Sequence, residues 1–275
     1  MSTKFKLIAE DTLKLLEQGY YINSNNEKIE IAELVQFAVD NTELYTPEQL
    51  DSLLSIDATA HKSNTKYEVI NETTLNAARR LAAEGQKDIT CLNFASAKNA
   101  GGGFLGGAVA QEECIARASG LYPCLLKAPD YYTFHRSQQN FLYSDHMIWS
   151  PRVPIFKHEN GSVTNEVLCI GIVTSAAVNA GELQKNGLSK AAVIEAVMRK
   201  RIEKVLALCV AKKQSVLILG AWGCGVFRND PEMIAGLFHE ALTGKFANCF
   251  DRIIFAVLTK NESMIEAFRK KFLFE

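Results

Sequence analysis

The chain has 275 residues, with 30 lysines and arginines against 31 aspartates and glutamates, so its formal net charge is −1. This length suits one α/β domain of roughly 200 residues with an added segment, or two small domains. A near-neutral chain lacks the basic surplus of a general nucleic-acid binder, so an anionic ligand would have to be held locally by backbone groups.

Residues 1 to 60 are predicted to form a helical extension. The apolar residues from Phe5 to Leu16 suit an amphipathic helix, and residues 46–49 read Thr-Pro-Glu-Gln, a capping box with proline at the first helical position. The first 18 residues contain no long apolar run, so they predict neither a signal peptide nor a membrane span. No proline-rich linker follows, and we expect this extension to pack on a core domain over residues 61–275.

From residue 67 onward the sequence alternates between strand and helix patterns. A strand is predicted over 68–70, a helix over 72–84 and a second strand over 88–94. Further strands are predicted over 146–149, 167–174, 215–219 and 252–258, and helices over 189–212, 230–243 and 261–271. Several strands are nearly continuous apolar runs, which indicates burial on both faces. The pattern predicts a three-layer α/β/α domain, with the basic residues 199–204 on a solvated helix face.

The segment from residue 99 to 113, called the first loop below, is the most informative part of the sequence. It joins five glycines to a Gln-Glu-Glu triplet and follows a predicted strand. Glycines let backbone N–H groups approach a ligand closely, and two carboxylates there can act on it as acid and base. If Gln111 begins a helix, neighbouring residues point about 100° apart, so Glu112 and Glu113 take different roles, one catalytic and one positioning.

A second glycine-rich segment, residues 220–227, is called the second loop. It follows the strand predicted over 215–219 and precedes the helix that begins at Asp230-Pro231. Loops at the carboxyl ends of strands form the ligand crevice of an open α/β sheet, and their free N–H groups bind anions. Two such loops could hold a diphosphate between them.

The cysteines and histidines predict no metal site. The seven cysteines are scattered, odd in number and never in a Cys-x-x-Cys pair, and the five histidines show no ligand spacing. This pattern argues against a zinc knuckle or a disulfide framework and favours a reducing compartment. We therefore expect a cytoplasmic protein that needs no metal or other cofactor and binds no membrane.

Taken together, these motifs resemble those of the microbial-type poly(ADP-ribose) glycohydrolases, which are macrodomain enzymes. Besides the two loops, the resemblance includes residues 93–96 (Asn-Phe-Ala-Ser), the segment 143–155 and the turn 174–177 (Thr-Ser-Ala-Ala), and it spans roughly residues 60 to 260. It implies a macrodomain-like mixed sheet in three α/β/α layers, so that residues 61–275 would be the catalytic domain. The substrate would be poly(ADP-ribose) or an ADP-ribosylated macromolecule, and the product ADP-ribose.

The resemblance also assigns roles to both loops. The glycines of the first loop would wrap the diphosphate and the distal ribose, and the second loop would cover the diphosphate from the other side, with Phe227 against the ribose or adenine. Asn99 would hydrogen-bond the ribose whose bond is cleaved. The ligand-binding residues implied are Asn99, Gly101, Gly102, Gly103, Gly106, Gly107, Gln111, Gly223, Cys224, Gly225, Val226 and Phe227, and the catalytic residues are Glu112 and Glu113.

Glu113 would be the acid/base, by its match to the second glutamate of the family. A partly desolvated carboxyl beside Glu112 and a diphosphate is expected to be protonated, and it would donate that proton to the departing ribose oxygen. The sugar would pass through an oxocarbenium-like state, and water activated by Glu113 would complete the hydrolysis. Attack would occur from the free end of the polymer.

Two other functions remain to be separated from this one. A macrodomain can bind ADP-ribose without cleaving it, or cleave only mono-ADP-ribose from an acceptor, although a pure reader needs no paired carboxylates. Gly101-x-Gly103-x-x-Gly106 also formally matches a dinucleotide-binding fingerprint, but about six residues separate it from its strand. Trp222 and Phe227 could be core or rim aromatics, and a nucleophilic Cys224 has no evident base in the sequence.

Overall fold

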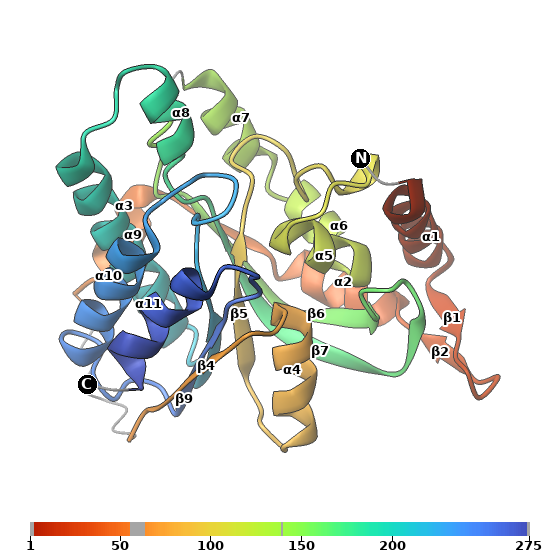
Figure 1. The fold of residues 1–275 in the computed structure, drawn as a ribbon. Helices are drawn as coiled ribbons and strands as arrows, with labels where there is room; N and C mark the ends of the chain where they lie inside the picture. The colour runs from red at the N-terminus through yellow and green to blue at the C-terminus, as the bar shows by residue number, and fades with distance from the viewer. Residues whose placement is uncertain (1–2, 56–63, 139, 274–275) are drawn as a thin grey trace.

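The computed structural model describes residues 3–55, 64–138 and 140–273 (Figure 1). Its central strands are β3 (Glu43–Tyr45), β4 (Lys66–Ile70), β5 (Ile89–Phe94), β6 (Met147–Lys157), β7 (Val163–Ser175), β8 (Val216–Leu219) and β9 (Arg252–Ala256). They form one seven-stranded sheet in the order β3-β6-β7-β5-β8-β9-β4. Strands β7, β5, β8, β9 and β4 run parallel, whereas β6 is antiparallel to its neighbours β3 and β7. The sheet is therefore mixed, as the family resemblance implies.

Helices cover both faces of this sheet. One face packs against α3 (Pro47–Leu53), α9 (Ala191–Ala211), α10 (Pro231–Thr243) and α11 (Glu262–Phe272). The other packs against α2 (Ala32–Asp40), α4 (Thr74–Ala83), α5 (Gln111–Ala118), α6 (Leu121–Leu126) and α7 (Pro129–Ser137). Figure 1 shows α9, α10 and α11 on one side of the sheet and α4 and α5 on the other. This is a three-layer α/β/α arrangement, and the short helix α8 (Ala180–Lys185) follows β7.

The central position of β5 in the sheet explains why its side chains are buried on both faces. Cys91 pairs with Ile172 of β7 and with Ile218 of β8, so this part of β5 has a neighbouring strand on each side. Side chains alternate between the two layers, and five of the six residues of β5 are buried. The first loop leaves from the carboxyl end of this strand.

The N-terminal segment contains strands as well as helices. Besides α2, α3 and β3 it includes α1 (Thr3–Gln18) and the hairpin of β1 (Tyr20–Ile22) and β2 (Lys28–Glu30). The predicted capping box is present, because the Thr46 side chain accepts from the Gln49 N–H and the Gln49 side chain accepts from the Thr46 N–H. The expectation of a wholly helical segment was wrong, since three-residue strands are too short to show a periodicity. The boundary predicted at residue 60 lies outside the described residues, so the division into two parts stays a prediction.

A buried lysine fastens α1 to the sheet. The Lys157 side chain is fully buried, and its ammonium group lies 2.5 Å from an Asp11 carboxylate oxygen and 3.0 Å from the Thr12 hydroxyl. Thr12 also donates to the Arg117 carbonyl of α5. A buried cation without a partner is strongly destabilising, so this contact fixes α1 beside the helix that begins with Gln111.

Two of the basic residues on α9 are buried, which corrects the prediction of a solvated face. Arg201 and Lys204 are each 1 % exposed in their side chains, and both pair with Asp145, at 2.9 Å and 2.8 Å. Arg201 also donates to the carbonyl of Ala176, at the turn after β7. Charged residues are rarely buried unless they are paired, and sequence alone did not show the partner. The pair holds the turn after β7 in place.

The seven cysteines are free thiols. Within the described ranges, no group of three or more histidine, cysteine or acidic side chains is placed to bind a metal ion. None of the helices in those ranges is long and apolar enough to cross a membrane.

Candidate active site

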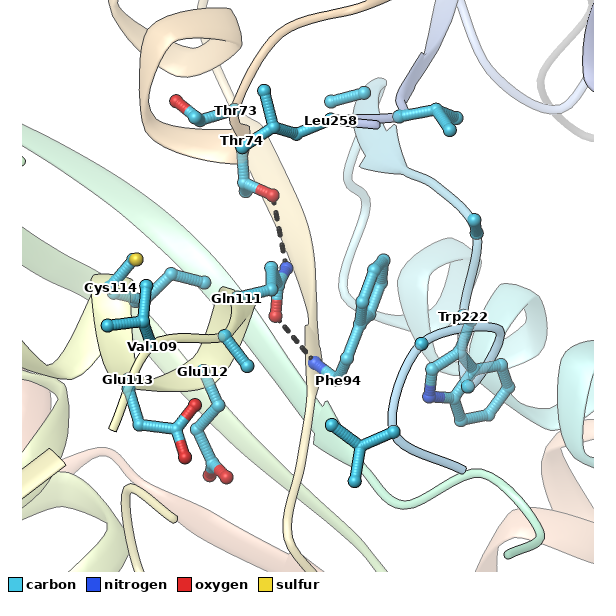
Figure 2. Close-up of a pocket in the computed structure, with 18 of the residues that line it drawn as sticks. Thr73, Thr74, Phe94, Val109, Gln111, Glu112, Glu113, Cys114, Trp222 and Leu258 are labelled. Atoms are coloured by element: carbon cyan, nitrogen blue, oxygen red, sulfur yellow. Dashed lines mark hydrogen bonds between the residues drawn. The ribbon is translucent and has the colours of Figure 1, made fainter. Parts of the chain in front are cut away.

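A pocket of about 620 Å³ opens where the carboxyl ends of β5, β8 and β9 meet the start of α5 (Figure 2). Its walls include the Gln111–Glu113 triplet, much of the second loop, the start of α4 and the end of β5. This is the edge at which ligands bind in open α/β sheets. The volume falls in the range of roughly 300 to 1,000 Å³ of typical small-molecule sites.

Glu112 is the buried member of the carboxylate pair. It is 2 % exposed, and its two oxygens accept hydrogen bonds from the Ser96 N–H at 2.7 Å and from the Asn93 amide at 3.3 Å. Burial raises the pKa of Glu112 to about 8, although both hydrogen bonds favour the charged form. Burial therefore favours the protonated form of Glu112.

Glu113 is the accessible member. Its side chain is half-buried, lines the pocket and accepts one hydrogen bond, from the Gly103 N–H at 2.9 Å. Figure 2 shows both carboxylates beside each other at the start of α5. The sequence predicts a partly desolvated, protonated Glu113, whereas the structure places the more complete burial at Glu112.

Gly102 lies under both carboxylates. A Cβ at this position would come within 2.3 Å of Glu113 Oε1 and 3.1 Å of Glu112 Oε2, and its φ is +61°. Only glycine tolerates both the left-handed backbone and this close approach. The two glutamates thus converge on one glycine, although they are adjacent on the helix.

Gln111 has a supporting position. Its amide nitrogen donates to the Thr74 hydroxyl at 3.1 Å and to the Leu92 carbonyl at 2.8 Å, and its oxygen accepts from the Phe94 N–H at 2.8 Å (Figure 2). Both amide hydrogens are used within the protein. Gln111 lines the pocket as predicted, but it ties α5 to α4 and to the end of β5 rather than offering a donor to a ligand.

Two glycines of the first loop, Gly102 and Gly103, lie against Glu113 rather than in the wall of the pocket. The short 3₁₀ helix η2 (Phe104–Gly106) lies between the triplet and Gly107, and Phe104 is buried against Tyr122 with ring centroids 4.8 Å apart. Asn99 is exposed, and its carbonyl accepts from the Gly102 N–H. The walls of the pocket do not include Asn99, Gly101, Gly102, Gly103, Gly106 or Gly107. Their predicted contacts with a ligand stay predictions.

The second loop presents backbone donors to the pocket. Gly223, Gly225, Val226 and Phe227 all line it. In the described part of the chain, the three successive N–H groups of residues 225–227 make no hydrogen bond to protein. Gly223 has φ +75° and leaves no room for a Cβ, which would lie 2.6 Å from that of Ala177. Such a row of free N–H groups suits an anionic ligand.

The structure decides between the alternatives for Trp222 and Cys224. Trp222 is fully buried and donates to the Ser175 carbonyl at 3.2 Å, so it belongs to the core, although its edge borders the pocket. Cys224 is 7 % exposed, and burial raises the pKa of its thiol strongly. A neutral, buried thiol is a poor nucleophile. The walls of the pocket do not include Cys224, so its predicted contact with a ligand stays a prediction. Phe227 is half-buried, with its ring 5.9 Å from that of Tyr143.

Several wall residues were missed by sequence reasoning. They are Phe5, Glu72, Thr73, Thr74, Phe94, Cys114, Glu159, Leu258 and Met264. Some of them carry a positional signal, because Glu72 follows β4 and Leu258 follows β9, at the same edge of the sheet as both loops. Phe5 and Glu159 carry no such signal in the sequence. The docking of α1 brings Phe5 to the pocket wall, and the turn between β6 and β7 brings Glu159 there.

Comparisons with known proteins identify the family of the chain and several similar structures. The family model for the microbial-type PARG catalytic domain matches residues 9–158. The structure of poly(ADP-ribose) glycohydrolase from Thermomonospora curvata is 42% identical, with a TM-score of 0.94, and the match covers 98% of this chain and 100% of that one. The same enzyme bound to the inhibitor ADP-HPD is also 42% identical, with a TM-score of 0.91 and the same coverage.

A second organism gives a similar result. Poly(ADP-ribose) glycohydrolase from Deinococcus radiodurans, in complex with ADP-ribose, is 40% identical with a TM-score of 0.83, and the match covers 89% of this chain and 99% of that one. No curated protein matches the chain. The matched family model spans more than half of the sequence, and the structural matches span nearly all of it. The chain therefore belongs to the microbial-type poly(ADP-ribose) glycohydrolase family.

Proposed function

We propose that this protein hydrolyses the ribose–ribose O-glycosidic bond of poly(ADP-ribose) and releases ADP-ribose. The observation that carries the proposal is the pair of carboxylates of unequal burial that converge on Gly102 at one end of the pocket. A protein that only reads ADP-ribose has no need of this pair. Membership in the family and the complexes of its relatives with ADP-ribose and ADP-HPD support the substrate.

In this proposal the second loop binds the diphosphate. The free N–H groups of residues 225–227 and the open space above Gly225, where no atom lies within 4 Å of a Cβ, leave room for phosphate oxygens to approach the backbone. Phe94, Phe227 and Leu258 provide apolar surface for the adenosine. The glycines of the first loop would contact the distal ribose, which brings the scissile bond to Glu113.

Glu113 is the general acid and base. A catalyst must reach both the departing oxygen and a water molecule, and Glu113 lines the pocket with one of its oxygens bonded to protein. It gives its proton to the ribose oxygen as the C1″–O bond breaks, and the resulting carboxylate accepts a proton from the water that attacks C1″. The cycle ends with ADP-ribose, a shortened polymer and the protonated carboxyl restored.

Glu112 is the positioning member of the pair. Both of its oxygens are held by protein, and burial favours its uncharged form. An uncharged carboxyl beside Glu113 avoids repulsion of the anionic diphosphate, which a second carboxylate would cause. We therefore assign catalysis to Glu113 and the shaping of its surroundings to Glu112.

The proposal includes removal of the terminal ADP-ribose unit, which is the direction of attack that the resemblance to the microbial-type enzymes implies. The reaction needs no metal ion, and the near-neutral net charge argues against general nucleic-acid binding. The seven free thiols favour the cytoplasm.

The competing function is binding of ADP-ribose without cleavage, or cleavage of mono-ADP-ribose alone. Incubation with end-labelled poly(ADP-ribose) of defined length, and separately with a mono-ADP-ribosylated protein, distinguishes the three. Loss of single units from the free end supports the proposal. Random internal cuts would contradict only the proposed direction of attack. Intact polymer together with tight binding of ADP-ribose would show that the protein binds ADP-ribose without cleaving it.

A further inference from the structure

The core on the α5 and α7 side of the sheet holds buried polar atoms that have no hydrogen-bond partner among the residues the structure describes. They are the side-chain oxygen of Asn93 and the hydroxyls of Tyr131 and Tyr132. Asn93 and Tyr131 are 0 % exposed and Tyr132 is 4 % exposed. Buried polar atoms of folded proteins are nearly always hydrogen-bonded, to protein or to ordered water, so three in one region require an explanation.

These atoms lie in the same layer as Glu112. Asn93 and Thr174 are paired in neighbouring strands, and the Asn93 amide donates to Thr174 at 3.2 Å as well as to Glu112. Tyr131 and Tyr132 of α7 pack with Ile115 of α5 in the core on that face of the sheet, and their rings lie 4.9 Å apart. Ser175 also has an unpartnered hydroxyl, but strand alternation turns it to the opposite face.

Glu112 has hydrogen-bond donors around its carboxyl oxygens but, among the described residues, no acceptor for its own O–H group. Both neighbours that contact its oxygens, the Asn93 amide and the Ser96 N–H, are donors. A protonated carboxyl adds an O–H group, which needs an acceptor. The acceptors without partners in this region are those of Asn93, Tyr131 and Tyr132.

We propose that ordered water links the Glu112 carboxyl to the hydroxyls of Tyr131 and Tyr132 and to the side-chain oxygen of Asn93. One water molecule can accept the Glu112 proton and donate to two of these oxygens. The two tyrosines are then positioning residues, because they act on the reaction through Glu112. Neither touches the pocket.

Electrostatics couples the two phenols to Glu112. The pKa values of both phenols are raised, first by burial and then by the charge of Glu112. The charged or titratable groups that act on Glu112 are Glu113 from its own helix and the two phenols from α7. On the strand side it meets the neutral Asn93 amide and the backbone N–H of Ser96, with that of Gly101 from the first loop.

The site has a consequence that can be measured without substrate. Water that accepts the Glu112 proton stabilises the protonated carboxyl, so removing a tyrosine hydroxyl weakens this acceptor. The pKa of Glu112 is then expected to fall by about half a unit to one unit, the effect of one modest hydrogen bond. If the phenols had no partner at all, their removal would leave this pKa unchanged and would not lower stability.

The test uses carboxyl-¹³C-labelled glutamate and NMR titration of the full-length protein, with the Glu112 signal assigned by its loss in Glu112→Gln. Tyr131→Phe and Tyr132→Phe are compared with Tyr21→Phe, a matched control in which an equally buried phenol has a protein partner in Thr164 at 3.3 Å. A lower Glu112 pKa in one or both α7 variants, with the control unchanged, supports the proposal. Urea unfolding should also show a lower midpoint in the affected variant.

A high-resolution crystal structure of the wild type checks the water directly. We expect density between the Glu112 carboxyl and the α7 hydroxyls. A dry site, or a Glu112 pKa that neither α7 variant moves, overturns the proposal. The consequence for catalysis rests on the proposed function. In Tyr131→Phe and Tyr132→Phe we expect the alkaline limb of the pH profile of kcat/KM to move to lower pH. Failure of hydrolysis in the wild type would overturn that function and leave the titration result intact.

Discussion

Substitution of Gly102 by alanine tests the geometry of the carboxylate pair. The added Cβ would lie 2.3 Å from Glu113 Oε1 and 2.9 Å from its carboxyl carbon, whereas ordinary contacts begin at about 3.5 Å. Glu113 must therefore retreat by roughly 1 Å, and a displacement of that size in a catalytic group can reduce kcat by about 10²-fold. The φ of +61° adds a backbone penalty of about 1–2 kcal/mol to the folded state.

The assay measures kcat on poly(ADP-ribose) together with urea unfolding, and Gly236→Ala provides the control. Gly236 lies inside α10, and no atom lies within 4 Å of its Cβ position, so alanine there should leave kcat unchanged and raise stability by about 0.5–1 kcal/mol. We expect Gly102→Ala to lose both activity and stability. If it folds and its kcat stays within threefold of wild type, the position of the Glu113 carboxylate does not limit the reaction.

Three other results are expected. Glu113→Gln should lower kcat by about 10² to 10⁴ and still bind ADP-ribose in calorimetry; lost binding would indicate a structural role instead. Because burial raises the pKa of Glu112 to about 8, above its ordinary value of 4.5, its contribution to stability is complete below pH 4.5 and is lost as pH rises through 8. Urea midpoints should therefore fall more steeply over this window in the wild type than in Glu112→Gln, and parallel curves would disprove the shift. Gly225→Val should weaken ADP-ribose binding at least tenfold with an unchanged melting temperature, since its side chain would enter open space beside the free N–H groups; unchanged affinity would move the diphosphate elsewhere.

The strand–helix alternation and the two glycine loops were predictable because their signals are local. The buried strand β5 shows as an apolar run, and the glycines before Gln111 show where the backbone must turn tightly. The proximity of the two loops was predictable because the carboxyl ends of parallel strands lie at the same edge of a sheet. These features depend on neighbours in sequence and on the direction of the strands.

The remaining features depend on contacts between distant segments. Glu112 and Glu113 are identical in type and adjacent, and only the packing of α5 on β5 shows which of them is buried. Gln111 has the composition of a ligand-binding residue, yet tertiary contacts with Thr74 and Leu92 occupy its donors. Lys157 is charged and was unremarkable in the sequence, but the docking of α1 depends on it.

The most direct test of the account is a time course with radiolabelled poly(ADP-ribose) in the presence of EDTA, with wild type, Glu113→Gln and Glu112→Gln side by side. We expect the wild type to release monomeric ADP-ribose without a metal ion. Glu113→Gln should release almost none, and Glu112→Gln, which keeps an uncharged group at the buried position, should retain more activity than Glu113→Gln. Intact polymer with the wild type, despite tight binding of ADP-ribose, or full activity in Glu113→Gln would contradict the account.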